Sequence, residues 1–199
     1  MSAHPSDFSS LAWPLGTGRL VLRPATQDDV DAVLAYRSLP EVAQFLSSGP
    51  LTREEVVDRI ASDTLRSAPG HPEPLLGLVV EQAGDVVGDA MVRLEPDDNG
   101  MWTAVLGYTI HPERAGRGLA TEVARALVRL CFTDLHVAMV QADVFTPHRA
   151  SQRVLEKAGQ RLVAHKAAGS EGDGRPRMDD FVYAVTAAEW ASRRTPHGS

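Results

Sequence analysis

A turn rich in small residues, placed between an expected strand and an expected helix, limits the fold of this chain more than any other feature. Gly116, Gly118 and Ala120 stand at every second position of this turn. Alternating apolar residues at 103–110 indicate a strand before the turn, and the apolar spacing of 119–132 indicates a helix after it. Another strand-like run follows that helix. A strand, a crossover helix and a second strand of the same sheet form a β-α-β unit with parallel strands, so the sequence predicts such a unit here.

The same turn has the properties of a phosphate site. The first N–H groups of a helix lack intrahelical partners, and together with the helix dipole they attract phosphate oxygens. Gly116, Gly118 and Ala120 carry almost no side-chain bulk, so the backbone can approach a diphosphate closely. Arg117 can add a charge-assisted contact. A tight turn without a ligand explains the same residues equally well, and the chain has neither a G-x-x-x-x-G-K-[ST] loop nor the third glycine of a dinucleotide-binding turn.

Strands and helices are mixed along the rest of the chain, which predicts an α/β (α+β) fold. Thr26 is placed to cap one expected helix, and Thr52, three residues before Glu55, gives a second helix a capping-box pattern. A turn at 83–85 joins two strands of an antiparallel meander. The expected strands are 19–24, two within 75–95, 101–110, 137–145, 161–166 and 179–186, and the expected helices are 26–39, 51–65, 119–132 and 148–159.

Length and composition indicate one domain with one core. A chain of 199 residues, 43% of them hydrophobic, can bury one sizeable core but hardly two. We expect residues 1–18 to form an N-terminal leader and residues 19–194 a single domain.

The charge, the cysteine content and the N-terminus exclude several function classes. A formal net charge of −6 argues against binding to nucleic acid or to an anionic membrane, whereas a cationic substrate would be attracted. The single cysteine, Cys131, is expected to be a buried thiol on a helix. No export signal and no stretch of ~18 apolar residues is present. We therefore expect a soluble cytoplasmic protein, monomeric or homodimeric, without membrane or nucleic-acid partners.

Residues 115–120, Ala-Gly-Arg-Gly-Leu-Ala, resemble the [Q/R]-x-x-G-x-[G/A] hallmark of the GNAT superfamily of N-acetyltransferases. Ala115 departs from the pattern, in which Gln or Arg is usual. In this family most diphosphate contacts come from backbone amides, so the departure is expected to weaken the site without abolishing it.

A second segment, 148–160, resembles the family pattern N-x-x-S-x-x-[VL]-[LY]-E-K-x-G-F. His148 replaces Asn and Gln160 replaces Phe. The matching residues are Ser151, Val154, Leu155, Glu156, Lys157 and Gly159. The ends of the chain resemble the branch that contains the ribosomal-protein N-terminal alanine acetyltransferases.

The resemblance implies a mixed, mostly antiparallel sheet of six to seven strands, flanked by helices, with two central parallel strands that splay apart. Acetyl-CoA, as co-substrate, would enter between them, with its pantetheine arm along Tyr108, Thr109 and Ile110 and its diphosphate on the glycine turn. The cofactor-binding residues implied in this way are Thr109, Ile110, Ala115, Gly116, Arg117, Gly118, Leu119, Ala120, Thr121, His148 and Ser151.

Direct transfer of an acetyl group to an amine requires a base and a proton donor. Ser151 and Tyr108 are the catalytic candidates for the donor. Ser151 has an alternative role as a helix cap, and Tyr108 has one in core packing. Cys131 is not expected to act as a nucleophile, because no His or acid is spaced to activate it.

The base is not found in the sequence. Many members of this branch carry Glu where this chain has Val105. Glu81, Asp89 and Glu95 lie on neighbouring strands, and each is expected to be a solvated strand residue. His148 either caps its helix or touches CoA, and the remaining histidines lack metal-ligand spacing, so no metal site is expected.

Two functions stay open. The first is an N-acetyltransferase that moves an acetyl group from acetyl-CoA to a primary amine, either a protein N-terminus or a small molecule. The second is a non-catalytic acyl-CoA-binding module, since Val105, Ala115 and His148 all depart from the family pattern. The loops expected to surround the acceptor contain the acidic residues Glu41, Glu54, Glu55, Glu171 and Asp173. These residues either attract an amine or are simply solvated.

Overall fold

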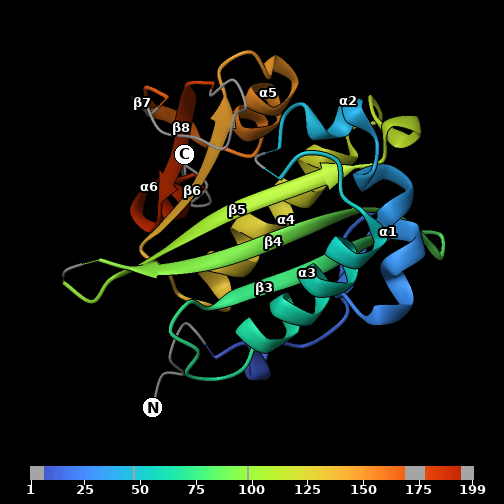
Figure 1. Ribbon diagram of the computed structural model, residues 1–199. Helices are drawn as coiled ribbons and strands as arrows, with labels where there is room; N and C mark the ends of the chain where they lie inside the picture. The colour runs from blue at the N-terminus through green and yellow to red at the C-terminus, as the bar shows by residue number, and fades with distance from the viewer. Residues whose placement is uncertain (1–6, 47, 98, 169–177, 194–199) are drawn as a thin grey trace.

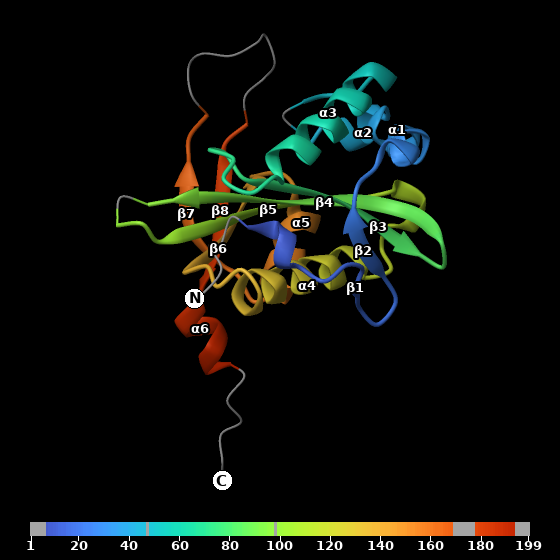
Figure 2. The same cartoon turned by 90° about the horizontal axis from the view of Figure 1, so that it is seen from below.

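A computed structural model describes residues 7–46, 48–97, 99–168 and 178–193. One sheet, with helices on both faces, makes up this part of the chain (Figures 1 and 2). The strands are β1 (Leu15–Gly16), β2 (Val21–Pro24), β3 (Leu75–Gln82), β4 (Asp85–Pro96), β5 (Trp102–Ile110), β6 (Met139–Phe145), β7 (Arg161–Lys166) and β8 (Asp180–Thr186). The helices are α1 (Val30–Arg37), α2 (Pro40–Ala43), α3 (Arg53–Arg66), α4 (Leu119–Thr133), α5 (Arg149–Lys157) and α6 (Ala187–Ser192), with 3-10 turns η1 (Phe8–Ser10), η2 (Gln27–Asp29) and η3 (Pro112–Arg114).

The strand order is β1-β2-β3-β4-β5-β6-β8-β7, and every neighbouring pair is antiparallel except β5 and β6. This confirms the predicted mixed, mostly antiparallel sheet. It has one strand more than expected, because the two residues of β1 pair with β2 from within the segment expected to be a leader. Phe8, from the same segment, is buried in the main core. Two residues are too few to produce a periodic sequence signal, so β1 is not predictable from the sequence.

The parallel strands β5 and β6 pair over a short distance only. Their register runs from Thr103 opposite Met139 to Val105 opposite Gln141. Residues 106–110 of β5 continue without β6 beside them, and the two strands diverge visibly in Figure 1. The splay that the family resemblance implied is therefore present.

Each face of the sheet packs against its own helices. Along β3, Leu78 and Val80 join the larger core cluster with residues of α4, whereas Val79 points to the opposite face and packs with α1 and α3. This alternation follows from the two-residue period of a strand. In Figure 2, α1, α2 and α3 lie on one side of the sheet and α4 on the other. Cys131 of α4 is fully buried in the larger cluster, as expected.

A buried ion pair fixes α1 to β4. Asp89 accepts hydrogen bonds from Tyr36 Oη at 2.8 Å and from Arg37 Nε at 2.6 Å. Burial acts to raise the pKa of Asp89, but the charge and hydrogen bond of Arg37, the Arg59 charge and the Tyr36 hydrogen bond together hold the pKa below its ordinary value. The expectation that Asp89 is a solvated strand residue was wrong, because α1 covers this part of β4 and leaves Asp89 only 6% exposed.

Candidate active site

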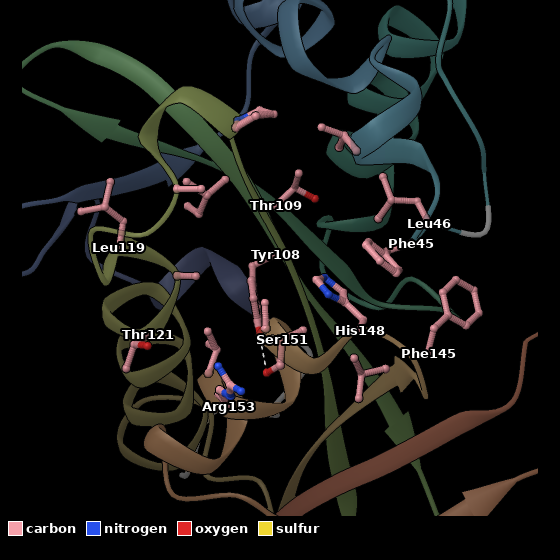
Figure 3. Close-up of a pocket in the computed structure, with 18 of the residues that line it drawn as sticks. Phe45, Leu46, Tyr108, Thr109, Leu119, Thr121, Phe145, His148, Ser151 and Arg153 are labelled. Atoms are coloured by element: carbon pink, nitrogen blue, oxygen red, sulfur yellow. Dashed lines mark hydrogen bonds between the residues drawn. The ribbon is translucent and has the colours of Figure 1, made fainter.

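A cleft of about 820 Å³ opens where β5 and β6 diverge. Its walls are the end of β5, the glycine turn with the start of α4, the start of α5, and α2 with the residues after it (Figure 3). The cleft therefore lies at the first turn of the β-α-β unit.

The glycine turn bends through two left-handed residues. Gly116 has φ of 75° and Gly118 has φ of 79°, values that residues with a side chain rarely adopt. Gly118 is the N-cap of α4 and has no side chain to cap the helix. Ala120 and Thr121, in the first turn of α4, line the cleft. Their N–H groups belong to the set that a helix leaves without intrahelical carbonyl partners, so this end of the cleft favours an anion.

The segment before β2 braces this turn from outside the cleft. Arg19 donates a hydrogen bond to the Arg117 carbonyl at 3.0 Å and pairs with Glu122 of α4 at 2.7 Å. Thr17 donates to the same carboxylate at 2.6 Å. Burial acts to raise the pKa of Glu122, but the bonds from Thr17 and Arg19 lower it overall. The one acidic side chain in the first turn of α4 is thus compensated by a cation and does not oppose an anion in the cleft.

All but one of the predicted cofactor-binding residues line the cleft. Arg117 is the exception. Its side chain is exposed and donates to the Glu113 carbonyl at 3.4 Å, so the geometry does not support the predicted side-chain contact. The sequence analysis missed three cations that do line the cleft: Arg114, Arg153 and Lys157. Lys157 belongs to the matching residues of the second motif and Arg153 lies within the same segment, but the direction of their side chains depends on how α5 packs.

Tyr108 and Ser151 meet inside the cleft. Their hydroxyl oxygens are 2.9 Å apart, as the dashed line in Figure 3 marks. Burial raises the pKa of Tyr108 to about 12 against the opposing effect of Ser151, so the phenol stays protonated. Tyr108 also packs against the main core, which is the structural role predicted for it. The Ser151 hydroxyl makes its hydrogen bond with Tyr108.

His148 precedes α5 and lines the cleft. It makes no side-chain capping bond to the helix, so its alternative role as a cap is absent. Its ring stacks on Phe45, with the centroids 4.0 Å apart and the planes 9° from parallel. Burial lowers the pKa of His148, so its imidazole is neutral at pH 7.

The carboxylates considered as bases from sequence do not reach the cleft. Glu81 pairs with Arg23 at 2.8 Å and Glu95 pairs with Arg93 at 2.7 Å. Glu55, expected in an acceptor loop, completes the predicted capping box with Thr52 at the start of α3.

Three other carboxylates line the cleft: Glu41, Asp143 and Asp180. Of the acidic loop residues named from sequence, Glu41 is the one found there, while Glu171 and Asp173 lie outside the described residues. Asp143 pairs with Lys166 at 2.9 Å. Burial, followed by the Asp143 charge, raises the pKa of Asp180.

Other reactive or binding features are few in the described part of the chain. Cys131 is buried, and burial raises the pKa of its thiol, which disfavours the thiolate form. Among residues 7–46, 48–97, 99–168 and 178–193, no three His, Cys, Asp or Glu side chains are grouped to hold a metal ion. Within the same residues, no helix is long and apolar enough to cross a membrane.

A cleft between diverging parallel strands, with a bare helix N-terminus on one side and paired hydroxyls on the other, matches the class of CoA-dependent acyltransferases that the motifs implied. Residues 19–161 match the family model described as "Acetyltransferase (GNAT) domain". The chain therefore belongs to the GNAT acetyltransferase family, whose members use acetyl-CoA, and it is a transferase enzyme.

Relatives and solved structures agree with this assignment. The chain is 28% identical to the "Uncharacterized N-acetyltransferase p20" of Bacillus licheniformis, over 89% of this chain and 98% of the relative. A GNAT-family acetyltransferase structure from Bacillus anthracis superposes with a TM-score of 0.75 at 21% identity, covering 88% of this chain and 99% of that one. Mycobacterium smegmatis RimJ, solved with a CoA disulfide, gives 0.72 at 20% identity, covering 87% and 88%. These two likenesses show the fold alone.

Proposed function

We propose that this enzyme transfers an acetyl group from acetyl-CoA directly to a primary amine, with both substrates bound in the cleft. The observation that carries the proposal is that the Tyr108–Ser151 hydroxyl pair lines the same cleft as the anion-favouring turn and three carboxylates. Together these features can supply a phosphate site, a proton donor and a site for a cation.

The diphosphate of acetyl-CoA fits the glycine turn. A Cβ atom at Gly116 would meet nothing within 4 Å in the protein, so the glycine leaves open space on the ligand side. The N-terminus of α4 supplies N–H donors and a positive dipole end. Arg114, Arg153 and Lys157 supply cations for the remaining phosphate charge.

The pantetheine arm fits the free edge of β5. Residues 106–110 have β4 on one side and no other described strand on the second side, because β6 has diverged. An extended, amide-containing ligand can use such an edge for backbone hydrogen bonds. Thr109 and Ile110 line the cleft at this edge, in agreement with the positions that the resemblance implied.

The chemistry that these residues support is direct attack. Tyr108 stays protonated at neutral pH and Ser151 shares its hydrogen bond, so the pair can donate a proton to a departing thiolate. A two-step route through Cys131 is not supported, because that thiol is 0% exposed.

The acceptor is proposed to be a cationic primary amine. Glu41, Asp143 and Asp180 place negative charge in the cleft, and the net charge of −6 favours approach of a cation. A protein N-terminus and a small-molecule amine both satisfy these charges. We further propose that residues 19–194 act as one domain, to which Phe8 and β1 of the preceding segment are packed, and that the protein is a monomer or a homodimer.

Release of free thiol from acetyl-CoA, measured with a panel of peptides, polyamines and aminoglycosides, tests the proposal. We expect turnover with at least one amine, well above slow hydrolysis, and the same amine should accumulate as its acetyl derivative by mass spectrometry. Tight acetyl-CoA binding with no turnover across the panel would instead support the non-catalytic acyl-CoA-binding module.

A further inference from the structure

We propose that His148 is the general base of this enzyme and takes the proton that the acceptor amine loses as it attacks. The assignment rests on the proposed function and fills the role for which this chain has no carboxylate at position 105. Val105 is a buried aliphatic residue, only 4% exposed, and cannot accept a proton.

The position of His148 is the first argument. Its ring enters the cleft from the residue before α5, and Figure 3 shows it close to Tyr108 and Ser151, on the side nearer Phe45. Ser151 follows three residues later in the first turn of α5. The proton acceptor and the proton donors therefore line one cleft. The reaction of an amine with a thioester requires both of them at the same place.

The freedom of its nitrogens is the second argument. The contact that holds His148 is a face-to-face stack on Phe45, which fixes the ring plane without using either nitrogen. Neither ring nitrogen has a hydrogen-bond partner among the residues that the structure describes. A nitrogen in this position is free to accept a proton from a bound ligand.

The protonation state is the third argument. Burial lowers the pKa of His148, so the ring is neutral at pH 7 and ready to accept a proton. The charged and titratable groups that line the cleft from other elements are Glu41 of α2, Tyr108 of β5, Arg114 of η3, Asp143 of β6 and Asp180 of β8, and α5 adds Arg153 and Lys157. None of these other groups is of a type that ordinarily titrates near neutral pH.

The carboxylates of the cleft are better suited to attraction than to proton transfer. Asp143 is held by the Lys166 ammonium group at 2.9 Å. Asp180 lies on β8, which pairs with the β6 strand of Asp143, and burial together with the Asp143 charge raises the pKa of Asp180. Glu41 comes from α2, on the opposite side of the sheet from α4.

The proposed transfer conserves atoms, electrons and protons. The acceptor ammonium ion first loses one proton to solvent. The nitrogen lone pair then forms a bond to the thioester carbonyl carbon, the C=O π pair moves onto oxygen, and His148 takes the second nitrogen-bound proton. The oxyanion pair returns to form the amide carbonyl, the C–S bond breaks, and the sulfur keeps that electron pair and takes a proton from the Tyr108–Ser151 pair. The imidazolium returns its proton to solvent, and the hydroxyl pair regains one from solvent.

The test compares His148→Asn, which restores the family residue without a titratable nitrogen, with the unaltered enzyme. We expect kcat to fall about 100-fold or more, as for loss of a general base, while calorimetry shows acetyl-CoA affinity within about threefold. The pH profile of kcat should lose the ionisation below about 6.5 that the unaltered enzyme displays. Added imidazole should restore part of the activity of His148→Ala, an effect that a structural role cannot produce.

A matched variant, Phe45→Leu, removes the stack and keeps the imidazole. Because the ring is then more solvated, we expect the ionisation in the pH profile to move upward toward about 6.5, with a loss in kcat of less than about tenfold. Unchanged kcat and an unchanged pH profile in His148→Asn would overturn the base assignment alone. Absence of turnover by the unaltered enzyme with every amine would overturn the proposed function itself and this assignment with it.

Discussion

The two ends of the cleft are built in different ways. The proposed cofactor end uses neighbouring residues, 115–121 with the exception of Arg117, and offers mainly backbone N–H groups whose direction is set by the left-handed Gly116 and Gly118. The proposed acceptor end uses side chains from α2, β6, α5 and β8, which are separated by up to 139 positions between Glu41 and Asp180. A site made of backbone tolerates many side-chain changes, but a site made of converging side chains depends on each one.

The positions at which this chain departs from the GNAT sequence motifs can be compared between the two ends. In the cofactor turn the departure is Ala115, whose side chain is exposed and need not touch the ligand. The other departures include Val105, which is buried and does not line the cleft, and His148, which lines the cleft and is the proposed base. Substitutions at both ends of the cleft can test this contrast between a site made of backbone groups and a site made of side chains.

The largest effect is expected at the cofactor end from Gly118→Val. A Cβ atom at Gly118 would lie 3.7 Å from Arg19 Nη2, on the side of the turn that Arg19 braces, and any side chain would strain a residue with φ of 79°. Both effects would displace the N–H groups that are proposed to bind the diphosphate. We expect acetyl-CoA binding to become undetectable by calorimetric titration.

Gly70→Val is the matched control for this variant. Gly70 has φ of 77°, and a Cβ atom placed on it would meet nothing within 4 Å. It does not line the cleft, so valine at this position would strain the backbone in the same way without affecting the ligand site. Its acetyl-CoA affinity should equal that of the unaltered protein. Equal affinities in both variants, each folded, would remove the phosphate role from the glycine turn.

The second largest effect is expected at the reaction centre from Ser151→Ala. Loss of the hydroxyl that bonds Tyr108 should lower kcat by roughly 10- to 1000-fold with little change in acetyl-CoA affinity. Steady-state kinetics with the double variant Ser151→Ala/Tyr108→Phe should show a loss smaller than the product of the two single losses, because the hydroxyls act as a unit. If kcat stays within about twofold while the melting temperature falls, Ser151 has only a structural role.

A smaller effect is expected at the acceptor end from Asp180→Asn. Removal of one of three negative groups should raise the KM for the amine by roughly 3- to 10-fold, because partly exposed charges contribute modestly to binding. The acetyl-CoA affinity should stay unchanged. Asp58→Asn, on the exposed side of α3, makes the same change in net charge outside the cleft. An equal rise in KM for both variants would mean that overall charge, not the cleft, attracts the amine.

The smallest effect is expected from Ala115→Gln, which restores the family residue at the cofactor end. Ala115 is exposed and lines the cleft, so a longer side chain has room to reach the ligand. Affinity for acetyl-CoA should be equal or tighter by about 0.5 to 1.5 kcal/mol, the net value of one hydrogen bond. A clear loss of affinity in the calorimetric titration would show that Ala115 is needed to avoid a clash.

The sequence by itself determined the elements, the mixed sheet, the glycine turn and the family. These features depend on local causes: the capping box of Thr52 and Glu55, the two-residue period of β3, and the need for glycine where φ is positive. Each of these signals lies within a few neighbouring residues, so each can be read before the chain is folded. The motif around 115–120 is predictable for the same reason, because its ligand contacts come from consecutive backbone groups.

Only the tertiary structure decided which side chains meet. Asp89 looked like a surface residue until α1 brought Arg37, 52 positions away, against it. Arg153 and Asp180 could not be assigned to the cleft from sequence, and neither could the stack of His148 on Phe45 be predicted. These positions depend on how α2, α5 and β8 pack around the diverging strands. Contacts of this kind depend on strand register and helix packing between segments that are far apart in the sequence. The local sequence around each residue encodes neither of them.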